Sequence, residues 1–222
     1  MKTSHKLALV LTAAVALSGC VNVLPKTKPV QLYRFGYVEK PVAKDAVAVN
    51  DAPLGPYTAV NMGQIDFPQE ASSDRILTTE GNEISYVGGS RWAVPARQLF
   101  SEAVSVGFSR DATTVRLDPR GPATAAYRLD MTVHKFESAY RHGRPTIVVS
   151  FDARVIRLSD RVVVGQKTIG AEVPVKRSDM SMMADAYDDA TTQTVSQLVD
   201  FTQTTVAANP VPDTKAGLPQ SK

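Results

Sequence analysis

The sequence predicts an α+β fold, in which two α-helices pack on one face of a mainly antiparallel or mixed β-sheet within a single domain. Two observations support this prediction. Segments in which apolar and polar residues alternate, as in half-buried strands, fill the early and middle parts of the chain. Two segments with the three- and four-residue apolar spacing of amphipathic helices interrupt and follow them. The resulting order is strands, helix, strands, helix.

Strands are expected on both sides of the first helix. The segment 127–135 has the most regular alternation, with Tyr127, Leu129, Met131 and Val133 on its apolar side. Two more long strands, 146–158 and 161–175, follow it after short turns, and three such strands in a row predict an antiparallel meander. The shorter strands expected earlier in the chain are 32–38, 57–67, 75–79 and 83–87, and the last two flank a hairpin-like turn at residues 80–82.

The two helices are expected at 93–110 and 178–206. The first has apolar residues spaced along one face, among them Leu99, Phe100 and Val104. The second begins at Ser178 or Asp179, either of which is a plausible N-cap residue type, and Pro210 lies just beyond its end.

The N-terminus has the layout of a secretory signal. Lys2 and Lys6 precede an apolar stretch, residues 7–17, which is shorter than the roughly 20 apolar residues that span a bilayer. The following string, Leu17-Ser18-Gly19-Cys20, resembles a bacterial lipobox, in which the cysteine is acylated and the chain is cut before it. Cys20 is therefore the predicted lipid-attachment residue, the alternative being a buried small apolar side chain. Several acyl chains on one residue would anchor the protein firmly.

The residue after Cys20 indicates where the anchored protein resides. An aspartate at that position commonly keeps a lipoprotein at the inner membrane of Gram-negative bacteria. Here the residue is Val21, so we expect the outer membrane, with the domain facing the periplasm.

Removal of residues 1–19 changes the charge balance. The whole chain has 25 Lys and Arg against 22 Asp and Glu. The signal contains two of those lysines and no acid, so the remaining 203 residues have 23 basic and 22 acidic groups, a net charge of +1. Lys and Arg are not clustered in the sequence as phosphate neutralisation needs, and we expect no nucleic-acid partner. The single cysteine excludes an intramolecular disulfide and a zinc site with several thiolates.

The mature chain divides into three parts by composition. Residues 20–30 contain proline and lack a period, as expected of a tether. Residues 31–208 form the predicted domain, with a proline-containing loop at 40–56. Residues 209–222 are rich in proline and polar residues and are expected to be a disordered tail.

Motifs for catalysis and metal binding are missing from the sequence. It contains no HExxH, GxSxG, P-loop or GxGxxG string, and the mature chain has two histidines, His134 and His142, both expected in solvated positions. Asp185, Asp188 and Asp189 are explained more simply by a helix N-terminus than by a metal. We therefore expect no enzyme, cofactor or metal. A periplasmic hydrolase, the alternative, would need a histidine beside a serine and a carboxylate.

Arg91 and Trp92 are the candidate residues for a partner interface. Tryptophan and arginine are enriched where binding energy concentrates in interfaces. The other interpretation is that Trp92, the single tryptophan, packs at the entrance to the first helix.

Short motifs follow one another in a characteristic order along residues 17–205. After the lipobox come Leu32-Tyr33-Arg34-Phe35, Ile65-Asp66-Phe67-Pro68, Arg75-Ile76-Leu77-Thr78, Arg91-Trp92-Ala93-Val94-Pro95 and Tyr127-Arg128-Leu129-Asp130-Met131-Thr132-Val133. This order and spacing resemble the ABC-type transport auxiliary lipoprotein family. Its members accompany lipid-transport systems of the mammalian-cell-entry (MCE) type and the paraquat-inducible type in Gram-negative bacteria.

The resemblance implies a non-enzymatic accessory subunit that faces the periplasm. Its partners would be an MCE-type substrate-binding or tunnel protein and the ABC permease and ATPase of the same system. Together they would move phospholipid or hydrophobic compounds across the envelope. Because some relatives form rings, a homo-oligomer is also expected. The alternative function is that of a structural or assembly lipoprotein of another envelope machine.

Overall fold

The computed structural model describes residues 29–36, 57–118 and 124–212. In this part of the chain, eight strands form one mixed sheet and two helices cover one of its faces, which confirms the predicted α+β class. The signal, most of the tether, the 40–56 loop and most of the C-terminal tail lie outside the described residues. The elements are β1 (Gln31–Tyr33), β2 (Thr58–Asp66), β3 (Arg75–Glu80), β4 (Glu83–Trp92), α2 (Ala96–Asp111), β5 (Val115–Leu117), β6 (Tyr127–Arg141), β7 (Arg144–Arg157), β8 (Val162–Pro174) and α3 (Met180–Ala208).

Strand β6 is the centre of the sheet. On one side it pairs antiparallel with β7, which pairs antiparallel with β8, so the predicted meander is confirmed. On its other side β6 has two parallel partners in succession, β2 along its first half and β3 near its end. Strand β4 then pairs with β3, β1 pairs with β4, and the three-residue β5 pairs with β2. Strand β5 was not predicted from the sequence, because three residues are too few to show a period.

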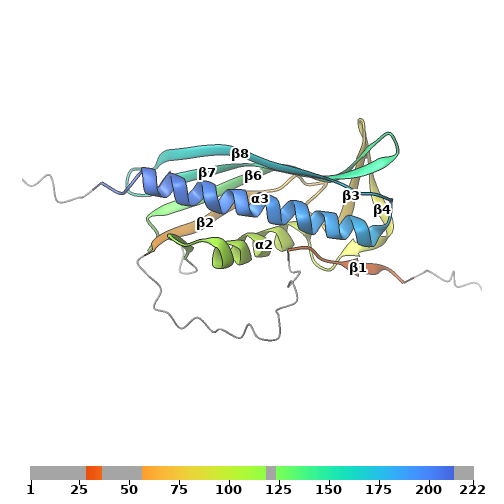
Figure 1. The fold of residues 1–222 in the computed structure, drawn as a ribbon, viewed down its shortest axis with the longest axis horizontal. Coiled ribbons are helices and arrows are strands. Elements are labelled where there is room, and N and C mark those ends of the chain that lie inside the picture. The colour runs from red at the N-terminus through yellow and green to blue at the C-terminus, as the bar shows by residue number, and fades with distance from the viewer. Residues whose placement is uncertain (1–28, 37–56, 119–123, 213–222) are drawn as a thin grey trace, which may run out of the picture. The chain divides into compact units, whose positions relative to one another are not determined.

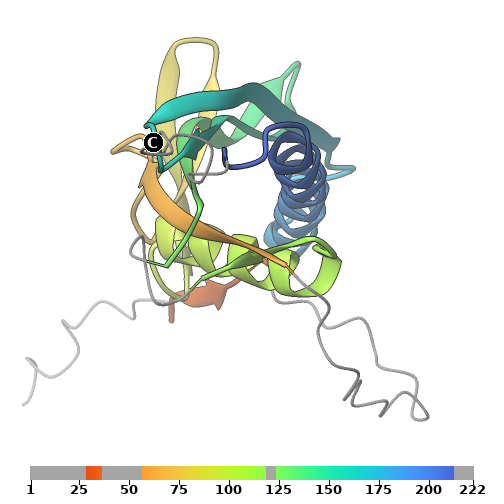
Figure 2. The ribbon, with the colours of Figure 1, turned by 90° about the vertical axis from the view of Figure 1, so that its left-hand side faces the viewer.

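Both helices lie on the same concave face of the sheet (Figures 1 and 2). The first turn of α3 is capped by Asp179, whose carboxylate accepts hydrogen bonds from the backbone of Ser181 (3.0 Å) and Met182 (3.2 Å), as predicted for this segment. The two helices approach closely at Gly107 of α2, where an added Cβ would lie 2.2 Å from Cγ1 of Val195. Glycine at this position therefore permits the observed helix spacing.

Strand β6 extends six residues beyond the predicted end at Lys135. The pairing with β7 shifts between Val133 and Lys135, so that His134 is an extra residue, a β-bulge. The bulge reverses the alternation, and Phe136 and Ser138 return to the buried face. The prediction ended too early because it relied on an uninterrupted two-residue period.

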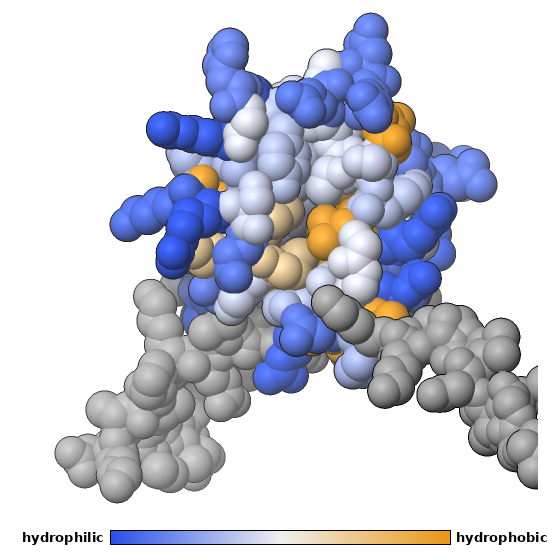
Figure 3. All heavy atoms as spheres, turned by 90° about the vertical axis from the view of Figure 1, so that its right-hand side faces the viewer, coloured by the Kyte–Doolittle hydropathy of each residue, from blue (hydrophilic) through white to orange (hydrophobic). Residues whose placement is uncertain are grey.

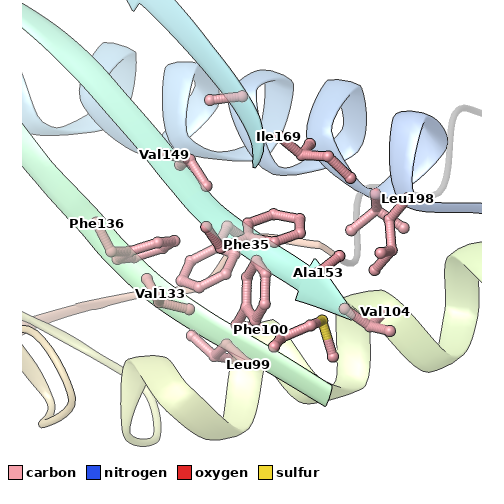
Figure 4. Close-up of a cluster of buried hydrophobic side chains, with 14 of the residues drawn as sticks. Phe35, Leu99, Phe100, Val104, Val133, Phe136, Val149, Ala153, Ile169 and Leu198 are labelled. Atoms are coloured by element: carbon pink, nitrogen blue, oxygen red, sulfur yellow. The ribbon is translucent and has the colours of Figure 1, made fainter. Parts of the chain in front are cut away.

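The core fills the space between the sheet and the helices (Figure 4). At one end of it, four aromatic side chains from distant parts of the sequence form what we call the aromatic cluster: Phe35, Trp92, Phe136 and Tyr187. The ring of Trp92 is 5.0 Å from that of Phe35 and 4.9 Å from that of Tyr187, and both contacts are edge-to-face. Phe136 lies 5.0 Å from Phe35 and 5.1 Å from Tyr187. All four side chains are at most 2% exposed, so the cluster joins β4, β6, α3 and the short segment after β1.

A hydrogen bond holds the segment after β1 against α3. The backbone N–H of Gly36 donates to Oδ1 of Asp188 at 2.6 Å. Gly36 has φ +76°, and an added Cβ would lie 2.6 Å from Cβ of Ala103, so both backbone angle and space require glycine. Partial burial raises the pKa of the Asp188 carboxyl above its ordinary value of 3.8, against the opposing effect of the Gly36 hydrogen bond.

Replacement of Trp92 tests the aromatic cluster. We expect Trp92→Ala to lower the free energy of unfolding by about 3–5 kcal/mol, since it removes a buried ring and leaves a cavity. Its exposed neighbour Arg91 is the matched control, and Arg91→Ala should cost less than about 1 kcal/mol. Urea denaturation followed by circular dichroism measures both. Equal, small losses would show that the ring is not part of the core.

Replacement of Asp188 tests the buried carboxyl. A raised pKa in the folded state means that the protonated form favours folding. The resulting contribution to the free energy of unfolding is complete below the ordinary pKa of 3.8. It is lost as the pH rises through the pKa that Asp188 has in the folded state. Asp188→Asn removes the ionisation and keeps an oxygen acceptor for Gly36. The variant should therefore melt at a higher temperature than the unmodified protein at pH 7.5, by a margin that shrinks at pH 4.5.

The control for this experiment is Asp200→Asn, which removes an exposed acid from a later part of α3, away from Asp188. Its effect on the melting temperature should be small at both pH values. If Asp188→Asn does not raise the melting temperature at pH 7.5, or raises it more at pH 4.5 than at pH 7.5, the raised pKa of Asp188 is contradicted.

Candidate functional site

Arg91 and Trp92 point in opposite directions, as neighbours on a strand must. Arg91 is exposed and forms an ion pair with Asp74, its Nη1 lying 3.1 Å from both carboxylate oxygens. Trp92 is 2% exposed and belongs to the aromatic cluster. Trp92 was interpreted either as an interface residue or as a packing residue at the entrance to the first helix. Its burial agrees with packing, and the indole offers no surface to a partner. A role of Arg91 in a partner interface stays a prediction.

Cys20, the predicted lipid-attachment residue, lies outside the described residues. The compact unit begins at Gln31, the first residue of β1. Acylation of Cys20 therefore stays a prediction from the sequence.

His134 forms part of a polar cluster on the sheet face opposite the helices. Its Nε2 is 3.0 Å from Oδ2 of Asp152, and the hydroxyl of Thr168 donates to Oδ1 of the same carboxylate at 2.6 Å. These contacts, the Thr168 hydrogen bond first, lower the pKa of Asp152. The sequence predicted a solvated position for His134, and its side chain is half exposed, but the contact with Asp152 was not predicted. The pairing depends on the β-bulge and on the register between β6 and β7.

This cluster does not have the geometry of a nucleophilic triad. The hydroxyl of Thr168 is bonded to the carboxylate and not to the imidazole, so the histidine does not activate it as a base would. The other histidine, His142, occupies the two-residue turn between β6 and β7. Among the described residues, neither imidazole forms a hydrogen bond with a serine.

No group of three or more His, Cys, Asp or Glu side chains in the described residues could hold a metal ion. Of the three aspartates near the start of α3, Asp188 has the structural role described above, and Asp185 and Asp189 are exposed. Neither described helix is long and apolar enough to cross a membrane.

The surface hollows among the described residues are open grooves. One of about 660 Å³ lies between the edge of β2 and the first turns of α2 and is lined by Met62, Gly63, Gln64, Ile65, Pro95, Arg97, Gln98, Ser101 and Glu102. Another, of about 330 Å³, lies beside the β3–β4 hairpin and is lined by Thr78, Thr79, Glu80, Glu83, Ser85, Val87 and Tyr140. The interior between sheet and helices is filled by the core. Binding on this domain is therefore expected on its surface.

An unpaired strand edge offers a surface of this kind. Residues 83–86 of β4, which we call the β4 edge, pair with β3 on one side, and no described strand pairs with them on the other. Ile84 is 55% exposed. Tyr86 is held in place by Arg75, whose guanidinium lies 3.8 Å from the ring centre, and by a 3.2 Å hydrogen bond to the carbonyl of Glu70. The β4 edge is thus ordered and carries free backbone donors and acceptors that can pair with an added strand.

Solved structures share this fold. Protein XCC0632 from Xanthomonas campestris is similar with a TM-score of 0.62 and 25% sequence identity, over 70% of this chain and 89% of that one. An uncharacterized protein matches with a TM-score of 0.54 at 14% identity, over 66% of this chain and 94% of its own, and shows the fold alone. The PelC dodecamer from Paraburkholderia phytofirmans has a TM-score of 0.38 at 16% identity, over 64% and 86% of the two chains, which is too low to bear on assembly.

No curated protein matches the chain. The family model described as the ABC-type transport auxiliary lipoprotein component matches residues 42–199. These residues include α2, the first two thirds of α3 and all the described strands except β1. The chain therefore belongs to the ABC-type transport auxiliary lipoprotein family.

Proposed function

We propose that the protein is the lipid-anchored auxiliary component of an MCE-type ABC system that moves phospholipid or hydrophobic compounds across the Gram-negative envelope. The observation that carries this proposal is the family match over residues 42–199. Membership of the family implies association with an ABC-type transporter and a membrane-anchored place in the envelope. The MCE-type partner, the transported compounds, the outer-membrane location and a ring-shaped homo-oligomer are the finer parts of the proposal.

The filled interior supports an accessory role. A protein that carries a lipid itself needs a pocket large enough to bury most of it. In the described part of the chain that space is taken by the core, and the hollows at the surface are open. The domain would therefore act by docking on the component that holds the transported molecule.

The β4 edge is the docking surface that we propose for the MCE-type protein. It can pair with an extended segment of that partner through backbone hydrogen bonds, while Ile84 provides an exposed apolar contact. Because Tyr86 is already fixed by Arg75 and Glu70, little ordering would be needed on binding. With a net charge near +1 for the mature chain, docking would depend on shape and apolar contact more than on electrostatic steering.

The lipid anchor is tested by mass spectrometry of the protein from envelope membranes. We expect the mature chain to begin at Cys20 with acyl groups on that residue, and to be found with the outer-membrane fraction. Cys20→Ser should leave an unacylated protein that is no longer extracted with membranes. A free Cys20 thiol in the unmodified protein would contradict the anchor.

Docking is tested by affinity purification of the tagged protein from crosslinked envelopes. We expect an MCE-type protein in the eluate, and at least a tenfold lower yield of it with Ile84→Lys, since an added charge on the β4 edge opposes strand addition. Val162→Lys, which changes a similarly exposed residue on β8, is the matched control and should leave the yield unchanged. Recovery of another envelope machine in place of a transporter would overturn the proposed function.

A further inference from the structure

We propose that one end of the domain makes a second, electrostatic contact with the anionic phospholipid headgroups of the membrane that holds the anchor. This end is formed by the β6–β7 turn and the loop between β8 and α3. We call its four basic residues the basic end: Arg141, Arg144, Lys176 and Arg177.

The sheet register brings these residues together. Arg141 and Arg144 are opposite each other at the two sides of the β6–β7 turn. The backbone N–H of Val175 donates to the carbonyl of Pro145 at 2.9 Å, so Lys176 and the residue after it emerge beside Arg144. Residues 141–146 and 172–177, although about 30 positions apart in the sequence, therefore form one surface.

Three of the four residues of the basic end have no ion-pair partner among the described residues. Arg141 is paired with Glu172 at 2.9 Å. Arg144, Lys176 and Arg177 are exposed, and within the described residues none of them has an ion-pair partner. The nearby carboxylate of Asp179 accepts hydrogen bonds from the backbone N–H groups at the start of α3 and keeps its negative charge. The four bases therefore outnumber the two acids beside them, Glu172 and Asp179, and this surface stays positive, which is complementary to anionic phospholipids.

The turn that carries the basic end is well defined. His142 and Gly143 have φ +53° and +73°, the signs required of both central residues in a two-residue type I′ turn. Such a turn matches the twist of the flanking strands, so the backbone at Arg141 and Arg144 is held in register. The charges are therefore presented together before any membrane contact.

The tether favours this end over the opposite one. The chain enters the compact unit at Gln31 of β1, and Figure 1 shows β1, the start of α3 and the β6–β7 turn at the same end of the long axis. Residues 20–30 can extend over at most about 36–40 Å, at roughly 3.3–3.6 Å per residue. The 29 residues of α3 measure about 43 Å at 1.5 Å per residue. Even when fully extended, the tether is no longer than α3, so an anchored domain reaches the membrane most readily with the end at which β1 lies.

Acidic residues at the same end restrict which side of it makes contact. Glu80 and Glu83 lie at the tip of the neighbouring β3–β4 hairpin. Figure 3, which faces this end, shows hydrophilic side chains projecting around a less polar centre. The contact that we propose is therefore made by the β6–β7 side, at the level of the headgroups and without insertion into the hydrocarbon.

Vesicle sedimentation tests the proposal. The probe is the mature chain with Cys20→Ser, which has no acyl group, mixed at low salt with vesicles of phosphatidylcholine alone or with about 30% phosphatidylglycerol. We expect binding to the anionic vesicles only, weakened by added salt. The triple variant Arg144→Ser, Lys176→Ser, Arg177→Ser should bind about a hundredfold more weakly, because each base near an anionic surface contributes about fivefold.

The matched control removes the same charge elsewhere. Arg154, Arg161 and Lys167 are exposed residues on β7, β8 and the turn between them, and replacing all three with serine should leave vesicle binding within a few-fold. Circular dichroism verifies that both triple variants are folded. No binding at low salt, equal binding to both vesicle types, or equal losses in the two triple variants would overturn the proposal.

The orientation of the domain, with the basic end toward the membrane, depends on the anchor at Cys20, which belongs to the proposed function. The vesicle assay uses an unacylated chain, so its failure is distinct from a failure of acylation or of transporter docking, which are measured separately. Vesicle binding by the unacylated chain, together with an unmodified Cys20 in cells, would support the headgroup contact and contradict the lipid anchor.

Discussion

Burial of the aromatic cluster is the constraint on which the arrangement of this domain depends. Trp92 ends β4, Phe35 follows β1, Phe136 lies beyond the bulge of β6, and Tyr187 is on α3, so four separate segments must meet for any of the rings to leave water. Large aromatic side chains contribute strongly to core stability, and edge-to-face contacts add to it. The long α3 is thereby fixed to the same end of the sheet at which the chain enters the domain.

Because this packing fills the interior of the described domain, the surfaces that we propose for its function lie on the outside. The core leaves no described interior space for a transported molecule, and the polar cluster at His134 lacks an activated hydroxyl. What remains are strand edges, open grooves and charged loops. The auxiliary role that we propose uses two surfaces of these kinds, one for a partner protein and one for the membrane. In this molecule the β4 edge and the basic end are distinct surfaces, formed by different hairpins.

Local patterns in the sequence predicted most elements, and the errors have identifiable physical causes. The alternation from Tyr127 to Val133 predicted the core strand, and the bulge at His134 concealed its continuation to Arg141. The helices and the cap at Asp179 follow from spacing and from side-chain chemistry within one turn. The parallel pairing of β6 with β2 and β3 could not be read in this way, because it joins segments separated by some 60 residues.

The sequence by itself determined the class of fold, the family motifs and the predicted anchor at Cys20, since each depends on residues close together in the chain. Tertiary structure alone decided the rest. It placed Trp92 in the core and Arg91 on the surface, because a strand's neighbours face opposite sides and only folding shows which side is covered. It also brought Arg144 beside Lys176, and His134 beside Asp152, through strand register that no local pattern encodes.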